Sequence, residues 1–389
     1  MKIALVHDYF TQIGGAEQVA MQLFRLLPDP DLFAAVALQN RMPEGLKHAP
    51  VKTSWMQKLP GMERNYRHYF LLYPLGVESL DLSEYDLVIS SSSGYGKGVR
   101  ARRDAVHVCY CHNPMRWAWS FAQYSERERM GSAKRAVLSL LSGALRKWDL
   151  GASREPDHFI ANSKTVAERI LQAYGRHAEV IHPPIDVDRF RPSKSGTDDY
   201  YLVLSRLISY KRIDLAIEAC NRLGRELLII GEGPDRERLV SMAGPTIQFA
   251  GRLPDHRVEF HAARCRAVLF PGVEDFGMVP LEVAAAGRPA VAYYGGGARE
   301  TVEEGTTGVF FREPTAESLM KAIERLEAQE WSSRVLRKHA EKFSVPAFQA
   351  QFRAFLERVG VSVPEPDDRL ATLIPQVQDF SWTVAEDIA

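Results

Sequence analysis

Cysteine is scarce in this sequence, with four in 389 residues. Cys220 and Cys265 stand alone, whereas Cys109 and Cys111 are separated by one residue in the stretch VHVCYCH. That spacing is typical of two side chains on one face of a strand. Scattered cysteines do not form the disulfide framework of a small secreted domain, so we expect reduced, structural thiols.

Long apolar runs are also missing. No stretch approaches the roughly 18 apolar residues that a membrane-spanning helix needs. At the amino terminus the only apolar run is Ile3 to Val6, which is too short for a secretory signal. We therefore expect a cytoplasmic protein.

Net charge is absent, because 49 Lys and Arg balance 49 Asp and Glu. This excludes a strongly basic nucleic-acid-binding protein. The charge is nevertheless uneven: the segment from Lys97 to Lys147 holds 11 basic and three acidic residues. Within it, residues 127–150 combine basic and apolar side chains. This pattern suits a helix lying on an anionic membrane at the inner face, or an ordinary amphipathic helix packed on the protein.

Two domains are expected from the length, and the 46% hydrophobic and 25% charged content is that of a soluble globular protein. Short apolar runs alternate with helical patterns, which predicts a doubly wound α/β fold. The polar stretch 189–199 follows Pro183 and Pro184 and indicates a linker. We predict an amino-terminal domain at 1–185, a second domain at 186–345, and a segment at 346–389 whose helix crosses back to the first domain. Residues 360–389 carry no motif.

In the first domain, strands are expected at 2–6, 33–38, 87–91, 106–111, 157–162 and 179–182. Helices are expected at 16–27 and at 164–174, where Ser163 can act as the cap. Gly14 and Gly15 end the first loop and allow close approach of a phosphate or sugar, or form only a tight turn. The GxGxxG fingerprint is absent, which argues against a nicotinamide cofactor and a dehydrogenase. His112 follows a central strand at the edge where open α/β sheets bind ligands, although a lone histidine is often structural.

In the second domain, strands are expected at 200–204, 227–230, 247–250, 267–270, 290–294 and 306–311, with later helices at 315–329, 333–342 and 346–359. Arg206 and Lys211 lie in the first strand-to-helix turn, where such folds hold phosphate, unless they form only a solvated basic loop. Gly231 follows the second strand. Arg252 and Leu253 follow the third.

The segment 270–291, FPGVEDFGMVPLEVAAAGRPAV, has two glutamates, Glu274 and Glu282, around a turn that enters a helix. Pro280 suits the first helical position. The amides of Phe276, Gly277 and Met278 would then lie near the positive helix end and favour an anion. Glu282 could alternatively do no more than complement the helix dipole.

The segment resembles the paired-glutamate motif of retaining glycosyltransferases of family 4, in which seven residues separate the two glutamates. The match includes Asp275, Leu281 and the small residues from Ala284 to Gly287. The run CHNPMRWAW resembles bacterial O-antigen and exopolysaccharide enzymes that transfer mannose. The resemblance extends over residues 2–359.

This resemblance implies two Rossmann-like doubly wound domains facing a central cleft, the GT-B fold, with the donor on the second domain and the acceptor on the first. The implied catalytic residues are His112, Arg206, Lys211 and Glu274. Arg206 and Lys211 would hold the diphosphate, while Glu274 and His112 would position the transferred sugar. The implied donor-binding residues are Gly14, Gly15, Ser205, Gly231, Arg252, Leu253, Phe276, Gly277, Met278, Val279 and Glu282, of which Glu282 would hold the ribose.

The favoured activity is transfer of mannose from GDP-mannose to a glycan or a lipid-linked saccharide, with retention and without a metal ion or cofactor. UDP-glucose or another UDP-sugar is the next donor. The alternatives are a sugar-nucleotide epimerase and a non-catalytic sugar-nucleotide-binding subunit. The Asp-x-Asp pairs at Asp29 and Asp31 and at Asp186 and Asp188 lie outside the phosphate site. For retention, a donor phosphate oxygen acting as base is preferred to attack by Glu274.

Overall fold

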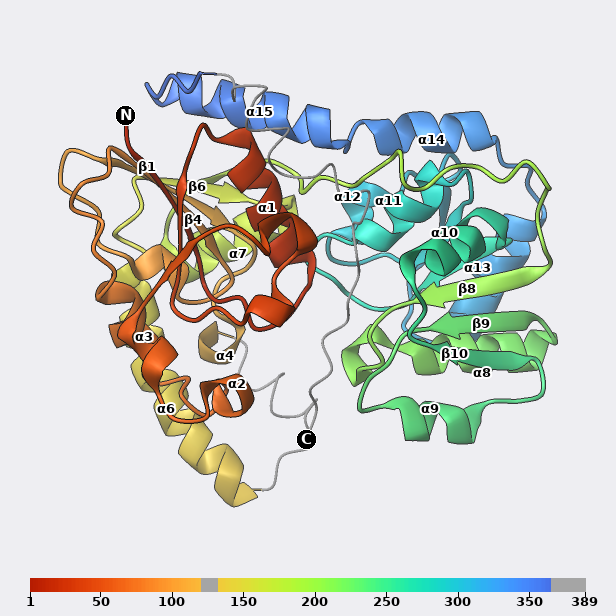
Figure 1. The fold of residues 1–389 in the computed structure, drawn as a ribbon. Helices are drawn as coiled ribbons and strands as arrows, with labels where there is room; N and C mark the ends of the chain where they lie inside the picture. The colour runs from red at the N-terminus through yellow and green to blue at the C-terminus, as the bar shows by residue number, and fades with distance from the viewer. Residues whose placement is uncertain (120–131, 365–389) are drawn as a thin grey trace. The chain divides into compact units, whose positions relative to one another are not determined.

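The computed structural model of this chain describes residues 1–119 and 132–364, which divide into two compact units. Of the described residues, the first unit contains Met1–His182 and 349–364, and the second contains Pro183–Phe348. Each unit has its own parallel sheet with helices packed against it (Figure 1). The α/β class and the presence of two doubly wound sheets are confirmed.

The first sheet has seven parallel strands in the order β3-β2-β1-β4-β5-β6-β7. Its strands are β1 (Ile3–His7), β2 (Asp31–Ala34), β3 (Val51–Thr53), β4 (Leu87–Ser92), β5 (Val106–Cys111), β6 (His158–Ala161) and β7 (Ala178–Val180). The winding direction reverses between β1 and β4. In doubly wound sheets, the carboxyl ends of the strands at such a reversal form a ligand-binding crevice.

The helices around this sheet are mostly short. They are α1 (Gly15–Leu26), η1 (Gln39–Arg41), η2 (Glu44–Leu46), η3 (Trp55–Lys58), α2 (Met62–Asn65), α3 (Tyr73–Glu78), η4 (Gly96–Gly98), α4 (Arg116–Trp119), α6 (Ser132–Ala152) and α7 (Lys164–Tyr174). Ser163 caps α7 as predicted, because its hydroxyl accepts a hydrogen bond from the Val166 amide at 3.1 Å.

The second sheet has six parallel strands in the order β10-β9-β8-β11-β12-β13, and its winding reverses between β8 and β11. Its strands are β8 (Tyr200–Leu204), β9 (Glu226–Ile230), β10 (Ile247–Gly251), β11 (Ala267–Phe270), β12 (Ala290–Tyr293) and β13 (Gly308–Phe311). Its helices are η5 (Ser209–Lys211), α8 (Ile213–Leu223), α9 (Arg236–Met242), α10 (Asp255–Arg264), α11 (Met278–Ala285), α12 (Ala298–Thr301), α13 (Ala316–Glu327) and α14 (Ser333–Glu341). The chain returns to the first unit within α15 (Val345–Arg358).

Burial follows from this layered arrangement. Every residue of β1 and of β4 is buried, as expected for central strands of a parallel sheet covered on both faces. Cys109 and Cys111 point into one cluster with Phe159 and Val166, which confirms that they share a strand face. All four cysteines are free and buried. Apolar runs without alternation therefore identified the central strands correctly.

Two details of the sequence-based prediction need correction. The helix α11 begins at Met278, so Pro280 is its third residue and not its first. Proline is tolerated there because the first four helical amides have no partner within the helix. The short edge strand β3 was not predicted, since its three residues are exposed or only partly buried and show no apolar run.

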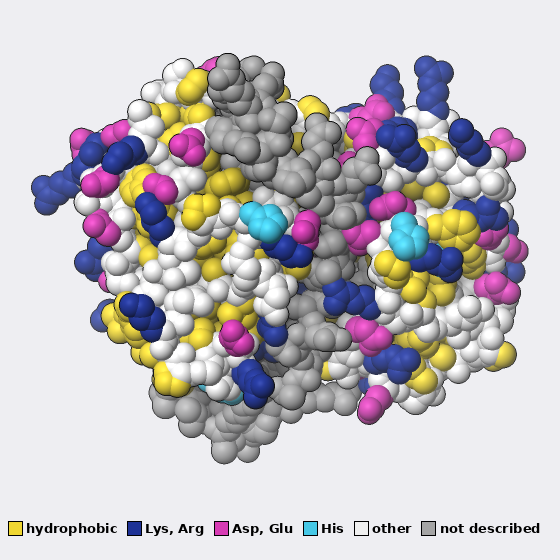
Figure 2. Space-filling model, in the orientation of Figure 1, with side chains coloured by type: hydrophobic (Ala, Val, Ile, Leu, Met, Phe, Trp, Pro, Cys, Tyr) yellow, Lys and Arg dark blue, Asp and Glu magenta, His cyan; other side chains and the backbone are white. Residues whose placement is uncertain are grey.

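The predicted basic surface between Lys97 and Lys147 includes residues 120–131, which lie outside the described residues. Lys97 does not belong to any surface, because its side chain is only 1% exposed. Basic and acidic side chains are intermingled on the face shown in Figure 2. In the part of the chain that the structure describes, no helix has the length and hydropathy required to cross a bilayer.

His107 on β5 makes the stability of the first unit depend on pH. Burial lowers the pKa of His107 to about 4, below the usual 6.5, and Ser90 Oγ lies 2.8 Å from its Nε2. The unfolded chain therefore binds more protons than the folded chain between these values. We expect the contribution of neutral His107 to the free energy of unfolding to be complete above pH 6.5. As the pH drops to about 4, the free energy of unfolding should fall by about 3 kcal/mol.

Urea unfolding of wild type and His107→Gln between pH 4 and pH 7.5 measures this contribution. The variant should be less stable at neutral pH but should lose less stability on acidification. Equal pH slopes in the two proteins would show that His107 is not the titrating group.

Candidate functional site

The loops that follow β8 and β11 meet at the winding reversal of the second sheet. Lys211, in η5 after β8, forms an ion pair with Glu274, in the loop after β11. Both side chains are largely shielded from solvent, at 13% and 22% exposure. Arg206 lies in the same β8 loop and is exposed. Among the described residues, no carboxylate forms an ion pair with Arg206, so its positive charge is available to an anionic ligand.

Glycines bring the turns at this edge into backbone contact. A Cβ atom at Gly231, where φ is +139°, would lie 1.9 Å from the Ser205 carbonyl oxygen. A Cβ atom at Gly272 would lie 2.8 Å from Lys211 Cα, and one at Gly297 would lie 2.2 Å from Phe276 Cα. The turns after β8, β9, β11 and β12 therefore form one packed group. Gly231 acts there by allowing a close approach between backbones.

The helix α11 starts in this group of turns. Gly277 precedes it with φ of +92°, a conformation that glycine adopts readily. Phe276 and Met278 on either side are buried, so the amino-terminal turn is anchored by packing. Glu282 is only 1% exposed and is the fifth residue of α11. A buried carboxylate at that position does more than complement a helix dipole from solvent.

The remaining predicted donor-binding residues are spread over this edge. Ser205 directly follows β8, and Val279 is partly buried in the first turn of α11. Arg252 is exposed and Leu253 is partly buried, and both follow β10, the last strand on that side of the sheet. Because β9 separates β10 from β8, these two residues lie farther along the edge than Arg206 and Lys211.

In the first unit, His112 lies just after β5 and is 8% exposed. Its Nε2 is 2.8 Å from Ser91 Oγ at the end of β4. The same hydroxyl is 3.1 Å from Nδ1 of His7 at the end of β1. Nε2 of His7 is 3.7 Å from Oε1 of Glu17 on α1. A connected row of polar side chains therefore crosses the winding reversal of this sheet.

The sequence did not single out His7, Ser91 or Glu17. One feature of the sequence could have indicated His7: it lies at the end of the first strand, just as His112 follows the fifth. Gly14 caps α1, and Glu17 Oε2 lies 3.1 Å from where a Cβ of residue 14 would be. The space that Gly14 leaves open is thus beside a carboxylate. That environment suits a hydroxyl better than a phosphate.

Asp8 fixes the loop that carries β4 into η4. Its carboxylate accepts hydrogen bonds from the Ser92 hydroxyl and from the amides of Ser93, Tyr95 and Gly96, at 2.5–3.0 Å. The side chain is 2% exposed. Such a set of donors holds a buried carboxylate in place and defines the loop conformation beside Ser91.

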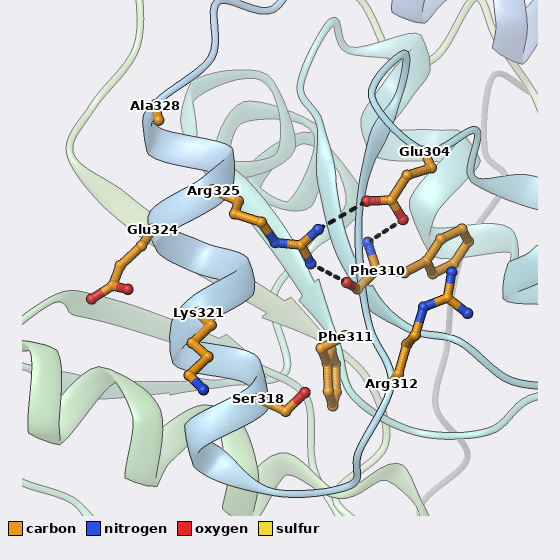
Figure 3. Close-up of a pocket in the computed structure, with 9 residues that line it drawn as sticks. All are labelled: Glu304, Phe310, Phe311, Arg312, Ser318, Lys321, Glu324, Arg325 and Ala328. Atoms are coloured by element: carbon orange, nitrogen blue, oxygen red, sulfur yellow. Dashed lines mark hydrogen bonds and ion pairs between the residues drawn. The ribbon is translucent and has the colours of Figure 1, made fainter.

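A cavity of about 850 Å³ lies elsewhere, between β13 and α13 (Figure 3). Arg325 crosses it, bonding to Glu304 and to the Phe310 carbonyl oxygen. None of the predicted site residues lines this cavity. We assign no ligand to it, because Arg325, the side chain that crosses it, is already bonded to protein groups.

Metal ligands were considered separately. In residues 1–119 and 132–364, no three His, Cys, Asp or Glu side chains gather as a metal-binding group. Independence from a metal ion remains a prediction.

Two family models match consecutive parts of the chain. The one described as Glycosyltransferase Family 4 matches residues 13–189, and the one described as Glycosyl transferases group 1 matches residues 184–343. Together they extend over both units.

Among curated proteins, a GDP-mannose-dependent alpha-(1-6)-phosphatidylinositol monomannoside mannosyltransferase of Mycolicibacterium smegmatis is 32% identical over 219 residues. That match covers 48% of this chain and 56% of the relative. A D-inositol 3-phosphate glycosyltransferase of Geodermatophilus obscurus is 30% identical over 224 residues, covering 49% of this chain and 50% of the relative. The chain thus spans about half the length of the curated relatives it matches.

Among solved structures, HepE of Anabaena in complex with UDP superposes with a TM-score of 0.68 at 18% identity, over 92% of this chain and 100% of that one. Sucrose-phosphate synthase of Thermosynechococcus elongatus gives a TM-score of 0.70 at 16% identity, over 92% and 99%. At sequence identities this low, the superpositions show a shared fold only.

Proposed function

Because the chain belongs to the glycosyltransferases of the family 4 type with the GT-B fold, we propose that it is a hexosyltransferase. In this proposal it transfers mannose from GDP-mannose to a glycan or lipid-linked glycan, with retention of the anomeric configuration. The reaction serves surface polysaccharide synthesis.

The observation that carries the proposal is the charge arrangement after β8 and β11. Arg206 is an exposed cation without an ion pair in the described part of the chain, and Lys211 is held against Glu274 in the facing loop. A diphosphate and a sugar need cations and a carboxylate near each other. Support comes from the contact of Lys211 with Glu274 and from the place of Arg206 in the same loop as Lys211.

Each group then has a distinct part in the reaction. Negative charge develops on the diphosphate as its bond to the sugar breaks, and Arg206, Lys211 and the amides at the start of α11 stabilise that charge. Glu274 accepts hydrogen bonds from sugar hydroxyls while keeping Lys211 oriented. Glu282 holds the ribose. A donor phosphate oxygen takes the acceptor proton, so Glu274 need not become a nucleophile.

Support for the donor comes from sequence similarity. The Mycolicibacterium smegmatis relative is described as GDP-mannose-dependent and as acting on a phosphatidylinositol monomannoside. The run from Cys111 to Trp119 resembles enzymes that transfer mannose to surface polysaccharides. A lipid-linked acceptor would also give a purpose to peripheral attachment at an anionic membrane, which belongs to the proposal.

The epimerase and the non-catalytic binding subunit are less favoured. The two family models that match are those of glycosyltransferases. The non-catalytic alternative is also weakened because Arg206, Lys211, Glu274 and Glu282 are all present. These are the residues to which the resemblance assigns the diphosphate, the transferred sugar and the ribose.

The test of the proposal is calorimetric titration with GDP, UDP, GDP-mannose and UDP-glucose in the presence of a chelator. We expect GDP and GDP-mannose to bind at least tenfold more tightly than the UDP compounds, a difference of about 1.4 kcal/mol. Preference for UDP would overturn the proposed donor. Binding of none of the four would overturn the proposed function, and binding only with added divalent metal would overturn the metal independence.

A further inference from the structure

Four polar side chains of the first unit form one row in which each neighbour is within bonding or ion-pair distance. Glu17 Oε1 is 3.7 Å from His7 Nε2, His7 Nδ1 is 3.1 Å from Ser91 Oγ, and Ser91 Oγ is 2.8 Å from His112 Nε2. All four are buried, with exposures of 8% or less. Bonds in such a row depend on one another, because each hydroxyl or neutral imidazole has one proton to donate.

The single proton of Ser91 decides between two arrangements. If Ser91 donates to His7 Nδ1, then Ser91 Oγ can accept from His112, and His112 carries its proton on Nε2. If Ser91 donates to His112 Nε2, then His7 must carry a proton on Nδ1, and His112 has its own proton on Nδ1. The two arrangements give opposite tautomers of His112.

The carboxylate of Glu17 favours the first arrangement. It faces Nε2 of His7, and a neutral His7 is stabilised when the proton is on that nitrogen and not when a lone pair faces the negative charge. Glu17 is the third residue of α1, where the helix dipole favours a negative charge. Asp8 also lies near His7 in sequence, but its carboxylate already accepts four hydrogen bonds from residues 92–96. The ring of Phe10, 4.8 Å from the ring of His7, brings no charge.

We propose that Glu17, His7 and Ser91 are positioning residues that hold the proton of His112 on Nε2. The consequence rests on the proposed function, in which His112 positions the transferred sugar. Nε2 faces Ser91, so Nδ1 is the ring nitrogen on which this tautomer places a lone pair. With the proton on Nε2, Nδ1 accepts a hydrogen bond, so it selects a sugar hydroxyl that donates.

The tautomer can be read without any ligand. Two-bond proton–nitrogen spectra of protein labelled with ¹⁵N-histidine distinguish the Nε2–H from the Nδ1–H form, and the His112→Gln variant identifies the His112 signals among the 11 histidines. At pH 8 we expect wild-type His112 in the Nε2–H form. Glu17→Gln keeps the shape and removes the charge, so His112 should shift toward Nδ1–H. Glu168→Gln on α7, which changes an exposed glutamate of the same unit, should leave it unchanged.

Wild-type His112 in the Nδ1–H form, or an unaltered His112 in Glu17→Gln, would overturn the proposal. Ser91→Ala provides a second check, because it removes the hydroxyl between His7 and His112. In this variant too, His112 should shift toward the Nδ1–H form. These spectra test the row of contacts whether or not the protein transfers sugar.

Kinetics test the positioning role. We expect Glu17→Gln to lower kcat for sugar transfer by roughly 10- to 100-fold, as for other residues that orient a reacting group, with little change in the KM for the donor. An altered tautomer with unchanged kcat would remove the positioning role and leave the proposed function intact. If wild-type protein transfers sugar from no nucleotide sugar, the proposed function fails, and the positioning role that rests on it is overturned with it.

Discussion

Replacing Arg206 with alanine is expected to lower kcat/KM for sugar transfer by roughly 10²- to 10³-fold. The reason is the distribution of charge around the loop after β8. Lys211 shares its charge with Glu274, whereas no carboxylate among the described residues neutralises Arg206. Arg206 is therefore the cation whose full charge can act on the diphosphate as the sugar leaves. The measurement is steady-state turnover of the nucleotide sugar, together with calorimetric affinity for the free nucleoside diphosphate.

Two further variants sharpen this result. Arg206→Lys should recover only part of the activity, because an ammonium group cannot make the paired contacts of a guanidinium group. Arg334→Ala, which removes an exposed cation of α14 in the same unit, should leave turnover unchanged. Undiminished turnover in Arg206→Ala would remove this residue from the proposed mechanism. A wild-type protein that binds donor but never turns it over would support the non-catalytic alternative.

Replacing Lys97 with methionine is expected to destabilise the first unit by about 3–5 kcal/mol. Lys97 and Asp149 form an ion pair in which the side chains are 1% and 0% exposed. The other oxygen of Asp149 accepts hydrogen bonds from Trp119 Nε1 and Tyr174 Oη, each at 2.7 Å. Burial alone would lower the pKa of Lys97, but the attraction of Asp149 is stronger, so the pKa of Lys97 is raised above its usual value. The methionine variant would leave a buried carboxylate without its cation.

Urea unfolding followed by tryptophan fluorescence measures the loss, since Trp119 and Trp148 both lie in this unit. The double replacement of Lys97 by methionine and Asp149 by leucine should recover most of it, because no charge is then left buried. Lys2→Met breaks the exposed pair of Lys2 with Glu84 and should change stability little. Equal effects of Lys97→Met and Lys2→Met would show that the buried pair does not hold the unit together.

Local sequence patterns were sufficient for most of the second unit. The strands at 200–204 and 267–270 were predicted with the bounds that the structure has, because an apolar run ended by glycine, proline or a polar turn is encoded within a few residues. The start of α11 was misplaced by two residues. Gly277, which has a positive φ, immediately precedes that helix, and the sequence does not show which of several glycines takes that conformation.

The buried polar groups of the first unit could not be predicted in the same way. Lys97 was counted within a basic surface because lysine is seldom buried without a partner. Its partner Asp149 is 52 residues away in the chain, and no sequence pattern near Lys97 predicts this pairing. His112 was identified from its place after a strand, but its bonding partners were not.

The sequence by itself determined the α/β class, the succession of strands and turns, and the residue types that suit a nucleotide sugar: Arg206 and Lys211 after one strand, and Glu274 and Glu282 after another. The tertiary structure alone decided which of these side chains meet. The pairing of Lys211 with Glu274, and the contact of His7 with Ser91 across 84 positions, depend on how strands distant in the chain are ordered and aligned in each sheet. Strand propensity is a property of neighbouring residues. Strand order and register follow from packing the whole unit.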